Sequence, residues 1–189
     1  MPIRKSLLAA LTLVCIAQVA EAGPIYMGHE YEVIGSGGIG WNAARTAAQA
    51  LGAGWDLVTI GDLAENTFVE SLLPSAPNVA DRSHFWAGAT DSAAEGVWQW
   101  VDGTPFLPLD WWVGEPNDFG NEDFLAFDIR SGVWAWNDAS DASAGGLVRG
   151  FIAERVAPPA AVPEPATMLL LGPGGAGLLM RRRSRSKNA

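Results

Sequence analysis

The chain has 189 residues, with 12 Lys and Arg, 21 Asp and Glu and a formal net charge of -9 at pH 7. This length accommodates one domain with tails and disfavours a multidomain enzyme. The charge disfavours nucleic acid as a partner, because nucleic-acid binding depends on basic side chains that neutralise phosphates. Residues 23–162 carry five arginines, no lysine and 19 acidic residues, a net charge of -14, so the tails differ in character from the body.

Residues 1–22 have the organisation of a secretory signal peptide. Arg4 and Lys5 form a basic start, an apolar run covers residues 7–20, and Ala20-Glu21-Ala22 forms a small-x-small cleavage site. The apolar run is short for a membrane span, which needs about 20 residues. We expect export, with cleavage before Gly23.

The single cysteine, Cys15, lies in this signal segment. The mature chain is therefore expected to lack disulfides, a cysteine nucleophile and Cys-ligated zinc. His29 and His84 are the only histidines, so a His-rich zinc site is not expected either.

The first half of the body predicts strands and two helices. Residues 31–34 predict a short strand and residues 57–60 another. Apolar residues at three- and four-residue spacing predict a helix over 41–51. A second helix is predicted over 62–73, where Asp62 and Glu65 have the spacing of a capping box and Phe68, Val69, Leu72 and Leu73 form the expected buried face.

The glycine run at 35–40 matches the G-x-G-x-x-G pattern of dinucleotide-binding folds. That fold requires continued alternation of strands and helices, which the later sequence does not show. Its cofactors are also scarce outside the cytoplasm. We therefore interpret the run as a flexible turn that leads into the first helix.

From residue 85 onward the pattern favours short strands with aromatic alternation. The expected strands are 85–89, 97–100, 124–129, 133–136 and 150–153, with Ser131-Gly132 as a tight turn. Helices followed by strands and long loops indicate an α+β fold with short antiparallel sheets. Most of the nine tryptophans are expected in the core, where they bury large apolar area in a domain without cross-links.

Residues 87–141 hold 11 acidic residues and one base, Arg130. Such a set is either spread over a solvated surface or binds cations, because like charges repel in a compact fold. Oxygen ligands without Cys or His suit a hard ion such as calcium.

Several motifs in this region together resemble the C-type lectin domain. They are Trp86-Ala87-Gly88, the 98–103 run WQWVDG, Gly114-Glu115-Pro116-Asn117, Asn121-Glu122-Asp123, Trp136-Asn137-Asp138 and Phe151-Ile152-Ala153-Glu154. The resemblance covers roughly residues 25–155 and implies a C-type lectin-like fold over 23–156, with two helices, short sheets and a long calcium-binding loop region. It also implies a cis peptide bond before Pro116.

The resemblance implies two calcium sites. The sugar-binding ion would be held by Glu115, Asn117, Glu122, Asn137 and Asp138. A supporting ion would use Asp91, Glu95, Asp118 and Asp123, with Glu122 shared. In this family a Glu-Pro-Asn loop implies sugars of the mannose, glucose, fucose or N-acetylglucosamine type.

Two features leave alternatives open. The positions of the disulfide cysteines of animal members hold Ala48, Phe124, Asp141 and Ala153 in this chain. The same fold also hosts functions without sugar, so a calcium-stabilised structural or protein-binding envelope protein is the main alternative. A glycosidase is less favoured, because the acidic residues are better explained as metal ligands.

The C-terminal tail follows an Ala/Pro-rich linker at 157–162. Residues 163–189 contain Pro163-Glu164-Pro165, an apolar stretch to Met180 and the basic cluster 181–183. This order resembles the PEP-CTERM sorting signal of Gram-negative bacteria. It implies transient membrane association, processing by an exosortase, and delivery to the outer surface or extracellular matrix.

Together these features predict a secreted, non-enzymatic surface lectin that binds exopolysaccharide, for example in a biofilm, through calcium. The sequence leaves open which glycan is bound, the oligomeric state and both cleavage points.

Overall fold

The computed structural model describes residues 22–75, 83–141 and 146–159. The described residues up to Ala157 belong to one compact unit. Nearly all of the predicted signal peptide, half of the linker and the whole sorting tail lie outside the described residues. Among the residues described, no helix has the length and apolar character needed to cross a membrane.

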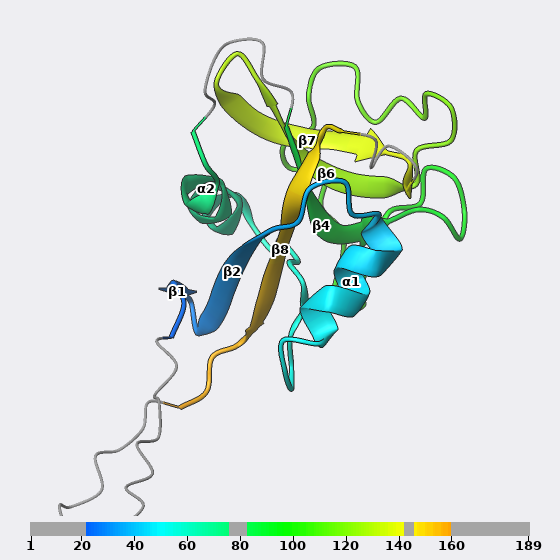
Figure 1. The fold of residues 1–189 in the computed structure, drawn as a ribbon. Coiled ribbons are helices and arrows are strands. Elements are labelled where there is room, and N and C mark those ends of the chain that lie inside the picture. The colour runs from blue at the N-terminus through cyan, green and yellow to red at the C-terminus, as the bar shows by residue number, and fades with distance from the viewer. Residues whose placement is uncertain (1–21, 76–82, 142–145, 160–189) are drawn as a thin grey trace, which may run out of the picture. The chain divides into compact units, whose positions relative to one another are not determined.

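Eight strands are joined in one sheet (Figure 1). In chain order the elements are β1 (Ile25–Tyr26), β2 (His29–Gly35), α1 (Trp41–Gln49), β3 (Asp56–Leu57), α2 (Leu63–Leu72), β4 (His84–Thr90), β5 (Gln99–Trp100), β6 (Phe124–Arg130), β7 (Val133–Ala139) and β8 (Val148–Val156). The sheet order is β1-β2-β8-β4-β6-β7, with β3 on β8 and β5 on β4. The expected α+β class is confirmed, but the strands form one continuous sheet.

The centre of this sheet joins the two ends of the domain. β2 pairs antiparallel with β8 over seven residues, from His29 opposite Val156 to Gly35 opposite Gly150. β8 in turn pairs in parallel with β4. Figure 1 shows β2 and β8 side by side with α1 and α2 on opposite sides of the pair. The glycine run 35–40 leads from β2 into α1, as the sequence indicates.

The strand bounds differ from the sequence prediction at identifiable positions. β7 continues to Ala139 because Asn137 and Asp138, although polar, are buried within the strand. The expected strand 97–100 is reduced to two residues, since the Val97 N–H donates to the Ala94 carbonyl in a turn. Of the expected strand 57–60, only Leu57 lies in a strand, because β3 ends at that residue.

Both predicted helices form, slightly shorter than expected. α1 buries Trp41, Ala44 and Ala48. At the start of α2, the Asp62 carboxylate accepts from the Glu65 N–H at 2.8 Å, which confirms the predicted cap. The Glu65 side chain accepts in return from the Gly61 N–H at 2.7 Å, rather than from the N–H of the cap residue itself.

The sheet is buried on both faces by two apolar clusters. Neighbouring residues of one strand enter different clusters, for example Leu125 and Ala126 on β6, because successive strand side chains point to opposite faces. Ala48, Phe124 and Ala153, at positions of the family's cysteines, all lie in the α1-side cluster. The fourth of these positions, Asp141, lies outside both clusters, and its carboxylate accepts from the side-chain amide of Asn42 at 3.2 Å. Apolar packing therefore occupies three of the four positions.

Trp136 is the centre of the other cluster. Its fully buried ring makes edge contacts with Trp100, Trp111 and Phe127, at centroid distances of 5.8 to 6.4 Å. Its indole N–H donates to the Asn66 side-chain oxygen of α2 at 2.8 Å, which satisfies the polar atom inside the core. This contact fixes the strand that carries Asn137 and Asp138.

One prediction tests the close pairing of β2 with β8. A Cβ added at Gly150 would overlap the Ile34 carbonyl oxygen, whereas one at Gly35, in the opposite strand, would meet nothing within 4 Å. Gly150→Ala should therefore lower the free energy of unfolding by about 3 kcal/mol, the upper part of the range for overpacking. Gly35→Ala, the matched control, should change it by about 0.5 kcal/mol or less. Urea unfolding measures both, and equal effects of the two variants would contradict this register.

Candidate functional site

The candidate site lies in the acidic loop region, defined as residues 91–123, and on the adjoining strand β7. This region connects β4 to β6 and includes the short strand β5, which pairs with β4 (Figure 1). The Glu115–Pro116 peptide bond is cis, as the resemblance implies.

Asp138 holds the Glu-Pro-Asn loop against β7. Its Oδ2 accepts from the backbone N–H of Asn117 at 2.8 Å and of Asp118 at 2.6 Å. The Asn117 amide also donates to the Glu115 carboxylate. Since Asn137 precedes Asp138 on β7, four of the five residues expected at the sugar site lie on two segments that are hydrogen-bonded to each other.

The fifth residue, Glu122, is connected to this group by charge. Burial, together with the nearby carboxylates of Asp138 and Glu115, raises the pKa of Glu122 to about 7. Its backbone N–H donates to the Asp118 Oδ1 at 2.7 Å. The Glu122 carboxylate therefore lies near those of Asp138 and Glu115, although these three do not converge within 4.8 Å of one another.

Arg130 supplies positive charge at this site, a role that the sequence analysis did not assign. Its guanidinium donates to Glu115 Oε1 at 2.8 Å, to Asn137 Oδ1 at 2.7 Å and to Asp128 Oδ2 at 2.6 Å. It also lies over the Trp112 ring, 5.2 Å from the centroid. The sequence signal that could have identified this role is that Arg130 is the only basic residue among residues 87–141.

The structure brings together three of the four residues expected at the supporting site. Ligand atoms of Asp91, Glu95 and Asp123 all lie within 4.8 Å of one another. Asp118 is not a member of this group, although its charge contributes to the raised pKa of Asp91, for which burial is the main cause.

Two buried oxygen atoms indicate that these groups fit a cation. Asp91 is 2% exposed and Asp138 is 1% exposed, and the Oδ1 atom of each has no hydrogen-bond partner among the described residues. A buried carboxylate oxygen without a partner is costly, and a metal ion would satisfy it. Because the surrounding donors are oxygens, the sites suit a hard ion such as calcium.

An apolar cavity of about 440 Å³ adjoins the Glu-Pro-Asn loop. Its lining includes Trp98, Phe106, Trp111 and, from the loop itself, Pro116. It places aromatic surface next to the polar group of Glu115 and Asn117.

Comparisons with known proteins identify the family of this domain. Residues 38–148 match the lectin C-type domain family, and residues 161–183 match the PEP-CTERM protein-sorting motif. The CD209 antigen of Papio hamadryas is 40% identical over 101 residues, which are 52% of this chain and 25% of that protein. The chain thus corresponds to about a quarter of that relative's length.

Solved structures show the same fold. The cow C-type carbohydrate-recognition domain of CD23, solved in the presence of a GlcNAc2Man3 oligosaccharide, has a TM-score of 0.60 and 28% identity, and the match covers 74% of this chain and 96% of that one. Herring type II antifreeze protein has a TM-score of 0.58 at 23% identity over 71% of this chain and 95% of that one, which shows the fold alone.

The family match covers more than half of the chain, and its members are carbohydrate-binding proteins without catalytic activity, as expected for a binding module. A PEP-CTERM sorting motif follows the domain and implies export to the envelope of a Gram-negative bacterium. The chain belongs to the C-type lectin domain family.

Proposed function

We propose that this chain is a calcium-dependent surface lectin that binds mannose-, glucose- or fucose-type residues of exopolysaccharide. Family membership and the glycan-binding solved relative support the binding of carbohydrate. The observation that carries the proposal is Asp138, which holds the Glu-Pro-Asn loop with one carboxylate oxygen and keeps the other buried without a hydrogen-bond partner among the described residues.

The proposed ligands are those that the family resemblance implies. The sugar-binding calcium would be held by Glu115, Asn117, Glu122, Asn137 and Asp138. The supporting calcium would be held by Asp91, Glu95 and Asp123, which converge in the structure, together with Asp118 and the shared Glu122. When bound, the first ion supplies coordination positions that two neighbouring sugar hydroxyls can occupy in place of water.

The side chains would select the sugar by hydrogen bonding. Glu115 and Glu122 carry carboxylates that accept from sugar hydroxyls, whereas Asn117 and Asn137 carry amides that donate to them. The order of acceptors and donors therefore distinguishes hydroxyl arrangements. The cavity beside Pro116 offers Trp98 and Trp111 as apolar surface for a further sugar residue of a polymer.

The C-terminal sorting motif supports a location of the lectin in the cell envelope. Cleavage by an exosortase-type enzyme, after transient membrane association, would release the domain to the outer surface or the extracellular matrix. A single lectin site binds weakly, so display of many copies on a surface would increase the strength of binding.

The second candidate is a calcium-stabilised structural or protein-binding domain. The structural similarity to herring type II antifreeze protein supports this candidate, because it shows that the same fold occurs in a protein that is not named as a lectin. Calcium binding without glycan binding would separate this candidate from the lectin.

The first prediction concerns sugar binding. The purified chain should bind mannose-type glycans in the presence of calcium and release them when a chelator is added, because the sugar hydroxyls would bind by coordinating the ion. Glu115→Ala and Asn137→Ala should each reduce binding by at least about tenfold, as removal of a charged hydrogen bond costs about 1.5–3 kcal/mol. Glycan-array and calorimetric measurements check this, with the exposed Asp102→Asn in the same loop region as control. Glycan binding that survives both chelation and these substitutions would contradict the mechanism.

The second prediction concerns Arg130, which competes with a cation for Glu115 and Asn137. Arg130→Gln should tighten calcium binding by about threefold to tenfold. The reason is that Glu115 and Asn137 would no longer have to break their hydrogen bonds with the guanidinium before they bind the ion. Calcium titration calorimetry measures the change. Arg45→Gln removes a comparable pair, with Asp56, outside the site and should leave calcium affinity unchanged. Equal calcium affinities in wild type and Arg130→Gln would show that Arg130 does not compete.

The third prediction concerns pH. Glu122 has a raised pKa in the folded chain, so between its ordinary pKa and about 7 the folded state binds more protons than the unfolded state. In chelator, the melting temperature should therefore rise as pH falls from 8 to 5.5. Glu70, with a pKa raised to about 8 by burial and Asp110, acts in the same direction. Glu122→Gln should thus reduce this rise without abolishing it, whereas the exposed control Glu32→Gln should not. Identical pH profiles for wild type and Glu122→Gln would contradict the assignment.

A further inference from the structure

Asp128 is a buried carboxylate that neither proposed calcium site uses. It lies on β6 with no exposed surface, and its two oxygens face partners on different sides. The Arg130 Nε donates to Oδ2 at 2.6 Å. The Nε2 of His84, a buried residue of β4, lies 3.4 Å from Oδ1. Because a buried charge opposes folding unless it is paired, these two contacts determine where the carboxylate lies.

The register of the sheet brings these side chains together. His84 lies directly opposite Asp128 in the antiparallel pairing of β4 with β6. Arg130 follows Asp128 by two residues on β6, so both side chains leave the strand on the same face. Trp112 contributes from the loop region, since its indole N–H donates to the Asp128 carbonyl at 3.0 Å and its ring lies against the guanidinium. The guanidinium is therefore held by a carboxylate and by an aromatic ring.

This arrangement fixes the direction of the other guanidinium nitrogens. Guanidinium is planar and rigid, so the bond from Arg130 Nε to Asp128 also determines where Nη2 points. The Nη2 donates to Glu115 Oε1 at 2.8 Å and to Asn137 Oδ1 at 2.7 Å. Glu115 belongs to the Glu-Pro-Asn loop and Asn137 to β7. One nitrogen thus joins the two segments of the sugar site, and its position depends on Asp128.

The charge of Asp128 strengthens its hold on the guanidinium. Burial alone would raise the pKa of Asp128, but the contacts with His84 and Arg130 outweigh it and hold the pKa below its ordinary value. The carboxylate is therefore ionised at neutral pH. A hydrogen bond between charged partners is roughly twice as strong as one between neutral partners. A neutral residue at this position would leave Arg130 less firmly held.

We propose that Asp128 is a positioning residue of the sugar site, which directs Arg130 onto two calcium ligands and thereby lowers the affinity for calcium. The ligands are Glu115 and Asn137, and His84 holds the Asp128 carboxylate in place from β4. Asp128 itself touches neither the ion nor the sugar. The inference rests on the proposed function, since it concerns the calcium of the same site.

The main test is calcium titration calorimetry of the full chain in a double-mutant cycle. Asp128→Asn is made in the wild type and in an Arg130→Gln chain. Asn keeps the shape of the side chain and an acceptor oxygen, but loses the charge. Loss of a nearby negative charge weakens calcium binding in both chains, whereas release of the guanidinium tightens it only where Arg130 is present.

The factors by which Asp128→Asn changes the calcium Kd should therefore differ at least about threefold between the two chains, with relatively tighter binding in the chain that has Arg130. Equal factors would overturn the proposal. Asp56→Asn is the matched control, because it alters a similar contact with an arginine Nε, that of Arg45 at 3.1 Å, outside the site. It should leave the calcium Kd unchanged.

Arg130→Lys provides a second test at a position that is not fully buried. Lysine keeps the charge but has a single ammonium in place of the rigid fork, so it cannot pair with Asp128 and also bridge the two ligands. Calcium should bind about threefold more tightly than in the wild type. A Kd equal to that of the wild type would show that charge alone matters, and would overturn the positioning role.

Nuclear magnetic resonance of the Arg130 Nε–H supplies a readout that needs no calcium. In chelator, this proton should be protected from exchange with water in the wild type and should lose that protection in Asp128→Asn. Equal exchange in the two chains would overturn the proposal. A wild-type chain that binds no calcium would contradict the proposed function, and the exchange measurement would then still decide whether Asp128 holds Arg130.

Discussion

A fold that brings several carboxylates together must also supply positive charge, because their mutual repulsion in a partly buried site otherwise opposes folding. This constraint governs the loop end of the molecule. Arg130 balances Glu115 and Asp128 and contacts Asn137, yet Asp91 and Asp138 each retain a buried oxygen without a hydrogen-bond partner among the described residues. The proposed calcium ions would provide the remaining charge. The guanidinium and the ion would then act on the same ligands, so metal binding involves exchange of one positive charge for another.

The rest of the fold keeps this charged region in place without disulfides. The sheet is covered on both faces, and Ala48, Phe124 and Ala153 contribute apolar packing at the family's cysteine positions. The Trp136 ring and its hydrogen bond to Asn66 fix β7 against α2, so the polar pair that follows the tryptophan is held at the edge of the core. Rigid apolar packing thus determines where the polar oxygens lie, which is what a preorganised binding site requires.

Much of the fold could be predicted because local signals were strong. The Asp62 cap and the helical spacing from Trp41 identified α2 and α1, and the separate motifs around Glu115 and Asn137 identified the family. The pairing of β8 with both β2 and β4 could not be predicted, since residues distant in sequence carry no local signature of register. The full length of β7 could not be predicted either. Asn137 and Asp138 are polar, and their burial in the strand depends on tertiary contacts.

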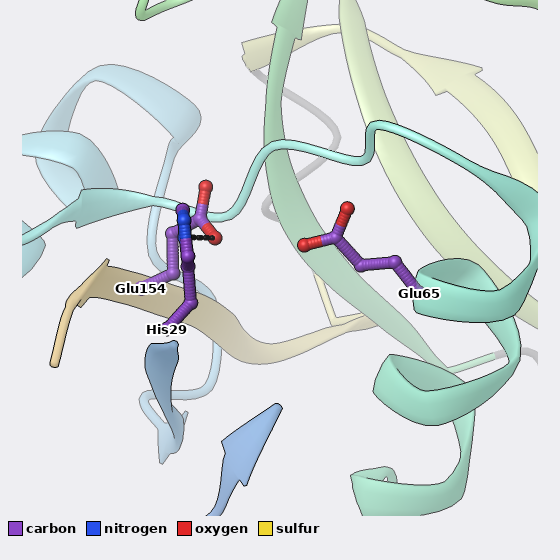
Figure 2. A group of neighbouring side chains, drawn as sticks. All are labelled: His29, Glu65 and Glu154. Carbon is purple, nitrogen blue, oxygen red and sulfur yellow. Dashed lines mark hydrogen bonds and ion pairs between the residues drawn. The ribbon is translucent and has the colours of Figure 1, made fainter. Parts of the chain in front are cut away.

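Side-chain contacts between distant parts of the sequence could not be predicted either. The acidic loop region could be recognised as a cation site from its composition, whereas the contacts of Arg130 with Glu115 and Asn137 depend on how the β6–β7 hairpin folds beside the loop. The contact between His29 and Glu154 (Figure 2) likewise joins residues 125 apart in the sequence, and it depends on the antiparallel pairing of β2 and β8. The most direct test of the central claim is a crystal structure with calcium and a mannose oligosaccharide. The account predicts an ion about 2.3–2.6 Å from oxygens of Glu115, Asn117, Glu122, Asn137 and Asp138, two sugar hydroxyls on that ion and Arg130 displaced from Glu115. An ion held by other residues, or Arg130 still bound to Glu115 with sugar elsewhere, would contradict it.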